Sequence, residues 1–322
     1  MKNNDLILQK LSKSYHGQVV FSDLSLALSP GNAYCLMAPS GTGKTTLFRV
    51  LTSFRMLTSK NILTANLKIC SGDILVSDSS NKKELVGRKN YQIGYLPQKF
   101  GCMPQLTVKE QLQYFCYLKK IPASEEKYEI SRVLDAVRMS EFANQKCKKL
   151  SGGMVRRVGI AQAILGKPQF ILLDEPTTGL DPATRKQVWN SVESLQCEDQ
   201  VTVFLTTHYM EEAAAAGHIA IIDKGKLCEF GTPQELKMRY AKDTLTLYYK
   251  QEKHTLTSDN EKIYDTIPIT AKSEIRVLEN SMEAIPILNQ LSDQLEGFEL
   301  QQGTMDDVFL AVTGKSLKGG NI

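Results

Sequence analysis

The sequence predicts an α/β fold built on a parallel sheet, and two observations predict it. Residues 33–37 form a short apolar run that ends in a turn, and residues 45–51 follow with helical spacing, so a strand, a loop and a helix succeed one another. Residues 169–173 and 201–205 are continuous apolar runs too short for helices, as in parallel strands buried on both faces. Because open α/β sheets bind ligands at the carboxyl ends of their strands, we expect the chemistry at the ends of these runs.

The turn after the first strand reads APSGTGKTT at residues 38–46 and matches the phosphate-loop pattern G-x-x-x-x-G-K-[ST] at Gly43, Lys44 and Thr45. Backbone N–H groups at a helix N-terminus favour an anion, and glycines let the backbone approach phosphate closely. In this pattern the lysine reaches the β and γ phosphates and the threonine hydroxyl ligates Mg²⁺. The predicted nucleotide-binding residues of the loop are Ser40, Gly41, Thr42, Gly43, Lys44, Thr45 and Thr46. The alternative is a glycine turn that contains a lysine by chance.

Ala38 stands where the pattern has glycine. It lies at the exit of the strand, so its methyl group should be tolerated if its backbone keeps a negative φ. We therefore expect the loop to bind phosphate despite the alanine.

Two carboxylates, Asp174 and Glu175, follow the buried run at 169–173 and precede Pro176. Asp174 is placed to hold the Mg²⁺ shell through water, and Glu175 to accept a proton from an attacking water or to polarise it. The alternative is a solvated strand exit before a proline turn. With a phosphate loop upstream, the two clusters together predict a nucleotide hydrolase.

A second candidate anion site reads LSGGM at residues 150–154, directly before a helical stretch at 155–165. Ser151 is a good N-cap, and Gly152 and Gly153 leave backbone N–H groups bare at the helix start. One chain cannot easily fold both anion sites onto one triphosphate, but two chains facing head to tail could. The alternative is an ordinary capped helix.

With these motifs the sequence resembles the ATP-binding cassette (ABC) ATPases from about residue 5 to residue 240. The family elements occur in family order: APSGTGKTT, GYLPQ ending in Gln98, LSGGM, FILLDEP, GLDP at 179–182, and TTH ending in His208. The resemblance implies a P-loop NTPase domain at 1–240 with an antiparallel β subdomain and an α-helical signature subdomain at about 99–166. A small α+β accessory domain would follow at 241–322. Met154 departs from the glutamine common in this signature, which removes a polar contact.

The resemblance also implies roles for individual residues. Two cassettes would clamp two ATP molecules, each between the phosphate loop of one subunit and the signature of the other. Tyr15 would stack on adenine, although a lone tyrosine is more often part of a core. Asp181 would lie at the subunit interface, and it is also a good N-cap followed by proline. The implied catalytic residues are Glu175, His208 and Gln98, the implied metal residues Thr45, Gln98 and Asp174, and the nucleotide-binding residues outside the loop Tyr15, Ser151, Gly152, Gly153 and Asp181.

Composition limits the partners. Lys and Arg number 39 against 35 Asp and Glu, and a net charge of +4 is too mild to imply nucleic acid. No apolar run approaches the roughly 20 residues that span a bilayer, and the N-terminus lacks the apolar region of a signal peptide. We expect a cytoplasmic protein, peripheral on the inner face of the cell membrane, bound to a separate polytopic transmembrane subunit and to a second cassette. Homodimer and heterodimer both stay open.

Thr107 and Glu110 form a capping-box pattern, and Val108, Leu112, Phe115 and Cys116 share one face of the helix that follows. We expect most of that face to be core of the helical subdomain. In transporters of the resembled family, this segment borders the groove that receives a cytoplasmic helix of the membrane subunit.

Two regions are less ordinary. Residues 56–70 contain an insertion, which we expect to be a surface loop rather than a partner contact. After about residue 240 the pattern predicts a strand at 244–249 and an amphipathic helix at 281–295. The closing TMDDVFLAVTGK resembles the ending of bacterial drug- and antibiotic-export cassettes, and its Val308, Phe309 and Leu310 can equally be a helix face folded back onto the small domain.

Three functions follow in order of preference. The first is the ATPase subunit of an exporter that moves a drug-like, peptide, lipid or polysaccharide substrate. The second is an importer subunit, which requires an external binding protein. The third is a soluble cassette that works on ribosomes or DNA. The sequence does not identify the transported substrate.

Overall fold

The computed structural model describes residues 5–39, 41–53, 70–77, 83–85, 93–250, 266–270 and 272–314. The chain divides into two compact units, the first ending at Gly231 and the second beginning at Thr232. Ser40 and, apart from Cys70, the insertion at 56–70 lie outside the described residues. The division into functional domains at residue 240 stays a prediction.

A six-stranded sheet forms the centre of the first unit among the described strands, in the order β10-β9-β3-β8-β7-β6. All neighbours pair in parallel except β10 and β9. The predicted strand at 33–37 is confirmed, and the other two predicted strands each begin one residue later than expected. The strands are β3 Ala33–Met37, β6 Ile93–Leu96, β7 Phe170–Asp174, β8 Thr202–Thr206, β9 His218–Asp223 and β10 Lys226–Gly231. Strands β3, β7 and β8 are buried along their whole length, which explains why their central residues are apolar.

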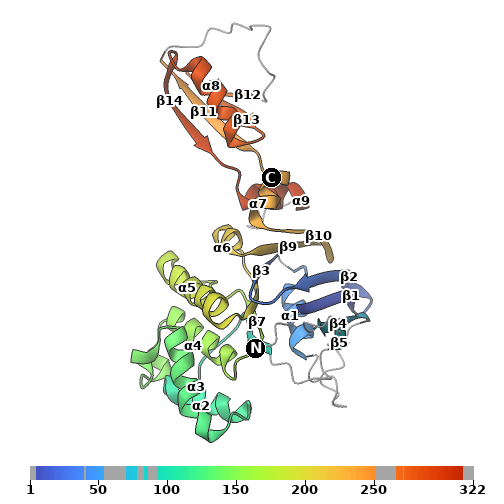
Figure 1. Cartoon of the computed structure of the whole chain (residues 1–322), viewed down its shortest axis with the longest axis vertical. Helices are drawn as coiled ribbons and strands as arrows, with labels where there is room; N and C mark the ends of the chain where they lie inside the picture. Colours follow the sequence, from blue (N-terminus) through green and yellow to red (C-terminus); the bar gives the residue numbers. More distant parts are fainter. Residues whose placement is uncertain are drawn as a thin grey trace. The chain divides into compact units, whose positions relative to one another are not determined.

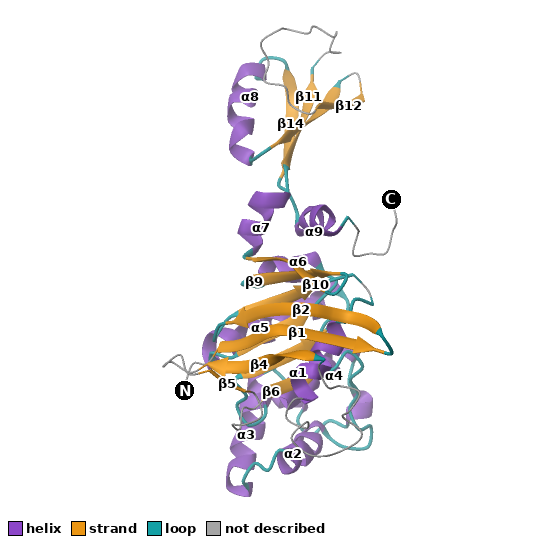
Figure 2. Ribbon diagram, turned by 90° about the vertical axis from the view of Figure 1, so that its right-hand side faces the viewer, coloured by secondary structure: helices purple, strands orange, loops and turns teal. Residues whose placement is uncertain are grey.

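An antiparallel sheet forms a second layer, as the resemblance implied, and Figure 2 shows its strands one below another in the order β2, β1, β4, β5. Its strands are β1 Asp5–Tyr15, β2 Gln18–Leu28, β4 Ser71–Ser77 and β5 Lys83–Leu85. Side chains of both sheets and of helix α1, Lys44–Ser53, share one hydrophobic core. In that core the rings of Phe48 and Phe204 lie 5.1 Å apart between centroids. The core holds the start of α1 against β3 and β8.

The expected helical subdomain is present, and Figure 1 shows its green helices α2, α3 and α4 grouped apart from the blue strands β1, β2 and β4. Thr107 and Glu110 form the predicted capping box. Val108, Leu112 and Cys116 are buried as expected, whereas Phe115 is only half-buried. The α-helices of the region and of the adjoining sheet are α2 Val108–Leu118, α3 Ala123–Ala136, α4 Gly152–Ile164, α5 Pro182–Asp199 and α6 Met210–Ala215, with 3₁₀ turns at Ser140–Phe142 and Cys147–Lys149.

The described part of the second unit contains an antiparallel sheet in the order β12-β13-β11-β14, on which helix α8 packs. Helix α8 buries Ala284, Ile287 and Leu291 against Leu245 and Leu247 of β11. The elements are α7 Pro233–Tyr240, β11 Asp243–Tyr249, β12 Thr266–Thr270, β13 Ser273–Leu278, a 3₁₀ turn at Ser281–Glu283, α8 Ala284–Leu291, β14 Leu295–Gln301 and α9 Met305–Thr313.

One prediction for this unit needs correction. The helix predicted at 281–295 begins as a 3₁₀ turn and ends at Leu291, because Leu295 already pairs with Tyr249 at the start of β14. In α9, Val308 and Phe309 are buried, in agreement with the alternative of a folded-back helix face, whereas Leu310 is 37% exposed. The strand predicted at 244–249 is confirmed as β11.

Candidate nucleotide-binding and hydrolysis site

The loop between β3 and α1 has the backbone that phosphate binding needs. Gly41 and Gly43 have φ values of +79° and +95°, in the left-handed region that glycine adopts most readily. A Cβ atom on Gly43 would lie 2.3 Å from Val20 Cγ1 of β2, so no larger residue fits there. Helix α1 begins at the next residue, Lys44, and its first N–H groups therefore face the loop.

Lys44 is held at the mouth of this loop. Its Nζ donates to the Ala38 carbonyl at 2.6 Å and to the Pro39 carbonyl at 3.2 Å, and the residue is 8% exposed. Burial lowers the pKa of Lys44, while the carboxylates of Glu175 and Asp174 act in the opposite direction. Among the described residues the partners of this buried ammonium are backbone carbonyls, so it is ready to take a stronger, charged acceptor.

Ala38 fits the loop as expected. It is not among the described non-glycine residues with positive φ, and its methyl group is buried in the shared core of the first unit. The alanine therefore causes no backbone strain at the strand exit.

Asp174 and Glu175 are fixed by one threonine at the end of the neighbouring strand. Thr206 Oγ1 donates to Asp174 Oδ1 at 2.9 Å and accepts from the Glu175 N–H at 2.9 Å. Asp174 is 1% exposed, and its Oδ2 has no hydrogen-bond partner among the described residues. Glu175 has a φ of +50°, a left-handed conformation that residues other than glycine seldom adopt.

Three polar side chains contact the Glu175 carboxylate. Its Oε2 accepts from Gln98 Nε2 at 2.7 Å and from Thr178 Oγ1 at 3.1 Å, and its Oε1 lies 2.6 Å from His208 Nε2. Burial raises the pKa of Glu175, but the hydrogen bonds and the charge of His208 outweigh it, and the pKa lies below its ordinary value. The three predicted catalytic residues thus meet around one ionised carboxylate.

Arg156 of α4 holds the Gln98 loop in place. Its Nη2 donates to the Gln98 carbonyl at 2.6 Å and its Nη1 to the Pro97 carbonyl at 3.3 Å. Burial lowers the pKa of Arg156, and the charges of Glu175 and Asp174 oppose that shift. The helix that begins at the signature is therefore tied to the loop that carries Gln98.

The signature residues lie at the N-terminus of α4, packed on the start of α5. Ser151 is the predicted N-cap and accepts from the Met154 N–H at 3.3 Å. A Cβ atom on Gly153 would lie 2.1 Å from Thr184 Cγ2, whereas one on Gly152 would meet Leu180 Cδ2 at 3.7 Å. Asp181 caps α5 by accepting from the Thr184 N–H at 3.0 Å, as its sequence pattern predicts.

The remaining predicted residues lie at the end of β1, in the loop and in the first turn of α1. Tyr15 is half-buried at the end of β1, and Lys13 Nζ lies 4.4 Å from the centroid of its ring. Thr42 Oγ1 donates to the Pro39 carbonyl at 2.7 Å. Thr45 and Thr46 are half-buried in the first turn of α1.

Comparison with known proteins identifies this arrangement. The sequence profile described as "ABC transporter" matches residues 21–178, which contain the phosphate loop, the signature and the two carboxylates. The chain belongs to the ABC transporter family. It is an ATP-binding subunit of that family and an ATP hydrolase, as the resemblance implied.

Three relatives of this ABC subunit match it over nearly their whole length. The linearmycin resistance ATP-binding protein LnrL of Bacillus subtilis is 27% identical, covering 96% of this chain and 98% of that protein. The Nod factor export ATP-binding protein I of Cupriavidus metallidurans is 29% identical, with 97% and 98% covered. The daunorubicin resistance ATP-binding protein DrrA3 of Streptomyces coeruleorubidus is 28% identical, with 98% and 97% covered.

Solved structures share the fold of the first unit. A nucleotide-free ATP-binding cassette from an ABC transporter superposes with a TM-score of 0.59 at 21% identity, covering 72% of this chain and 92% of that one. A second ATP-binding subunit of an ABC transporter gives a TM-score of 0.58 at 22% identity, covering 73% of this chain and 92% of that one. The predicted cassette fold is therefore confirmed.

The ABC subunit offers donors that fit Mg²⁺. Asp174 Oδ2 is a buried carboxylate oxygen without a hydrogen-bond partner in the described part of the chain, as expected of an atom whose partner is an ion or its water. The hydroxyl of Thr45 follows Lys44 in the first turn of α1. Hard oxygen donors of this kind suit a small divalent cation.

Sequence reasoning missed three residues that shape the site: Thr206, Thr178 and Arg156. The sequence contained a partial signal for Thr206, because this residue directly precedes the Thr207-His208 pair and ends a strand beside β7. Thr178 follows Glu175 by three residues, a spacing at which a turn can bring a hydroxyl back to a carboxylate. Arg156 gave no signal, because its acceptors lie 58 and 59 residues away in the sequence.

Proposed function

We propose that this ABC subunit powers export of a compound through a separate polytopic transmembrane subunit, working on the cytoplasmic face of the membrane. The observation that carries the proposal is the match of almost the entire chain, second unit included, to proteins named for linearmycin resistance, Nod factor export and daunorubicin resistance. A likeness confined to the cassette would not separate export from other ABC functions. No helix in the described segments is both long enough and apolar enough to cross a membrane.

ATP binds first at the loop of residues 41–46 and at the buried Lys44. The ammonium exchanges the carbonyls of Ala38 and Pro39 for the β- and γ-phosphate oxygens, because a charged acceptor forms the stronger hydrogen bond. Backbone N–H groups at the start of α1 face the same phosphates. Tyr15, on β1 beside the loop-contacting strand β2, stacks on the adenine.

Glu175 then acts as general base. Its pKa lies below the ordinary value, so it is ionised at neutral pH, and Gln98 and His208 lie on its two oxygens. A water that hydrogen-bonds to this carboxylate loses its proton to Glu175 as it attacks the γ-phosphate. His208 contacts the γ-phosphate from the β8 side, and Gln98 orients the water.

Mg²⁺ bound near Asp174, Thr45 and Gln98 would neutralise charge on the phosphates during transfer. Asp174 is held for that purpose by Thr206 and keeps Oδ2 available. Thr206 also fixes the backbone of Glu175, so the metal side and the base side of the site move together.

A second cassette completes each site. Ser151 and Gly152, which are exposed at the start of α4, and the buried Gly153 that follows them present N–H groups to the triphosphate bound by the partner cassette. Asp181 lies at the start of α5, whose Thr184 packs on Gly153, so it borders the same interface. Hydrolysis turns one shared phosphate group into two repelling anions, which opens the pair.

The test is to purify the tagged chain from detergent-solubilised native membranes in its Glu175→Gln form with ATP, and to identify the retained proteins by mass spectrometry. The Lys44→Ala form is the matched control, because it should not form the ATP-closed state. A multi-spanning membrane protein retained by the first form supports the proposal. An external substrate-binding protein in the same complex would indicate import instead, and ribosomal or DNA-associated proteins alone would overturn the transport function.

A further inference from the structure

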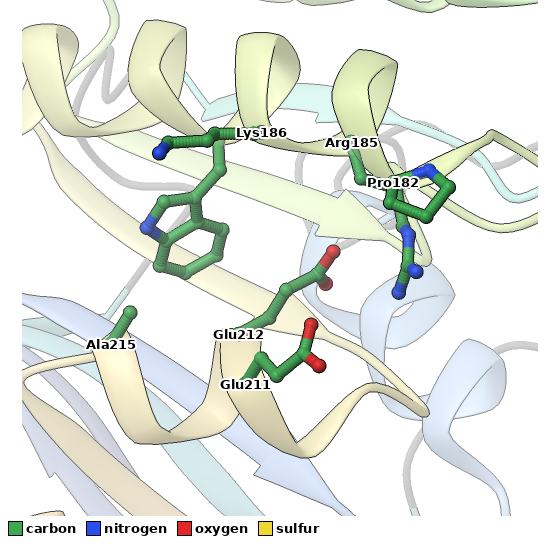
Figure 3. A pocket seen from close by; sticks show the side chains of 7 residues that line it. Pro182, Arg185, Lys186, Glu211, Glu212 and Ala215 are labelled. Carbon is green, nitrogen blue, oxygen red and sulfur yellow. The ribbon is translucent and has the colours of Figure 1, made fainter.

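Glu212 of α6 is a buried carboxylate outside the group of side chains around Glu175. It is 7% exposed, whereas its neighbour Glu211, in the same first turn of α6, is exposed. Figure 3 shows both side chains extending from α6, with Arg185 extending from α5 toward that helix. Burial is the largest influence on the pKa of Glu212 and raises it. Because a buried carboxylate costs free energy unless it is hydrogen-bonded, its partners indicate why it is there.

Two hydroxyls from the segments that carry the hydrolysis residues are hydrogen-bonding partners of this carboxylate. Thr207 Oγ1 donates to Glu212 Oε2 at 2.6 Å, and both groups are buried. The Thr177 hydroxyl is a second hydrogen-bonding neighbour, in a less regular geometry, and lowers the pKa of Glu212. Thr177 follows Glu175 by two residues, and Thr207 directly precedes His208. Glu212 therefore joins the segment after β7 to the segment after β8.

Capping of the helix does not explain why this carboxylate is buried. The third residue of α2, α7 and α9 is in each case an exposed carboxylate that accepts directly from the N-cap backbone N–H, namely Glu110, Glu235 and Asp307. In α6 the N-cap N–H, that of Tyr209, donates instead to Thr207 Oγ1 at 3.0 Å, and Thr207 in turn donates to Glu212. The Thr207 hydroxyl thus lies between the helix start and the buried carboxylate, and Glu212 orients the residue that precedes His208.

His208 is fixed by the residues on both sides of it in the chain. Thr207, before it, is 2% exposed and is bound to the α6 carboxylate. Tyr209, after it, donates its N–H to Thr207, and the guanidinium of Arg185 lies 3.9 Å from the centroid of the Tyr209 ring. The imidazole of His208 contacts Glu175 from this position. A change in the hydrogen bonds of Thr207 therefore moves the imidazole relative to the Glu175 carboxylate.

We propose that Glu212 is a positioning residue for ATP hydrolysis, which holds Thr207 and through it sets the position of His208 relative to Glu175. The inference rests on the proposed roles of His208 and Glu175. Among the described residues, the hydrogen bonds of Glu212 go to the segments after β7 and β8 and not to the loop at 38–46. Glu212 therefore acts on the rate of hydrolysis and not on the affinity for ATP.

The experiment measures kcat for ATP and the dissociation constant of a fluorescent ATP analogue, with the full chain and three variants. Thr207→Val removes the hydroxyl and keeps the size of the side chain, and Glu212→Ala removes the carboxylate. Glu211→Ala is the matched control, because it removes the adjacent exposed carboxylate of the same helical turn and should behave like the native chain. In the first two variants kcat should fall by about 10- to 100-fold, as expected when a catalytic group is misplaced by about 1 Å, while the dissociation constant stays within about twofold.

A double-mutant cycle separates this role from a general loss of packing. If Glu212 acts through Thr207, the double variant should be no slower than the slower single variant, whereas independent effects would multiply. Glu212→Gln should recover most of the rate, because its amide oxygen can still accept from Thr207. Multiplied losses, no recovery with glutamine, or a loss of ATP affinity as large as the loss of kcat would overturn the inference. If Glu212→Ala binds no ATP, an unchanged kcat in Thr207→Val overturns it alone.

Two further variants distinguish failure of this inference from failure of the proposed function. His208→Ala and Glu175→Gln enter the same assay and should both hydrolyse ATP slowly. Native rates in these two variants would overturn the proposed hydrolytic roles, and the inference with them. Slow turnover in these two variants, together with native rates in Glu212→Ala and Thr207→Val, would overturn the inference and leave the proposed roles in place.

Discussion

Glu175 and His208 lie at the ends of neighbouring parallel strands, with 2.6 Å between Glu175 Oε1 and His208 Nε2. The other carboxylate oxygen already accepts from Gln98 and Thr178. Both oxygens are therefore occupied by the protein's own donors. A water that is to lose its proton to Glu175 must displace one of them, so these side chains have to rearrange during each turnover.

Replacing Glu175 by glutamine should stop hydrolysis and preserve ATP binding. The amide keeps the size of the side chain but cannot accept the proton of water, so the hydrolysis rate should fall by about 10²-fold or more. ATP should then hold two cassettes together, which sedimentation velocity with and without ATP can detect. Thr178→Ala, which removes a single donor to the carboxylate, is the control and should retain most activity. Unchanged turnover in Glu175→Gln would contradict the role of general base.

Replacing Lys44 by alanine should weaken ATP binding. A hydrogen bond to a charged group contributes about 1.5–3 kcal/mol, so the dissociation constant should rise by roughly 10- to 100-fold. Equilibrium titration with a fluorescent ATP analogue measures it. Lys109→Ala, at an exposed position on α2, should bind like the native chain. Equal affinities in the two variants would mean that the loop at 38–46 does not hold the triphosphate.

Alanine should be tolerated at Gly152 but not at Gly153. A Cβ atom added at residue 153 would overlap Thr184 Cγ2, whereas one added at residue 152 would make an ordinary contact with Leu180. Overpacking of this kind costs about 1–3 kcal/mol, so Gly153→Ala should unfold at clearly lower urea concentration. Gly152→Ala should stay within about 1 kcal/mol of the native chain. Two variants of equal stability would show that α4 and α5 separate easily at this point.

Glu129 should make stability depend on pH. Burial raises its pKa, but Arg132, the Gly166 N–H and the charge of Lys167 outweigh burial and hold the pKa below its ordinary value. A lowered pKa means that the contribution is present above the unfolded-state pKa of about 4.3 and is lost as the pH falls through the lower folded value. Glu129→Gln should therefore be less stable than the native chain by about 1–3 kcal/mol at neutral pH.

Urea unfolding from pH 7 down to pH 3 checks this prediction, because the difference between Glu129→Gln and the native chain should shrink below about pH 4.3. Glu125→Gln, exposed near the start of the same helix, is the control and should lose less than about 1 kcal/mol. A difference that stayed constant over this range would mean that the ionised form of Glu129 contributes nothing.

Local patterns predicted much of the cassette, because its elements are determined by short-range rules. Apolar runs located β3, β7 and β8 to within one residue, and caps such as Thr107 and Asp181 marked helix starts. The helix predicted at 281–295 was too long, because the amphipathic pattern does not show that Leu295 pairs with β11. Where such a helix ends depends on strand pairing between segments that are distant in the sequence.

The sequence predicted which residues form the site but not which of them contact one another. Glu175 followed from its place after a buried strand, whereas His208 and Gln98 depended on the family pattern. That both lie on one carboxylate, and that Thr206 links Asp174 to the backbone of Glu175, are consequences of strand order in the sheet. A single sequence contains no local signal for that order.

The two strands that lead into the site differ in how firmly the central sheet holds them. Strand β3, which leads into the phosphate loop, is hydrogen-bonded to β8 on one side and to β9 on the other, and its backbone amides should exchange with deuterium among the slowest in the chain. Strand β6, which leads into Gln98, is the last described strand of the sheet and pairs only with β7 among them. The loop after β3 is thus anchored in a stiff support, while the loop after β6 can shift at the loss of few hydrogen bonds. We therefore expect nucleotide binding to move the sheet edge that carries Gln98, and the helices beyond it, more than it moves the phosphate loop.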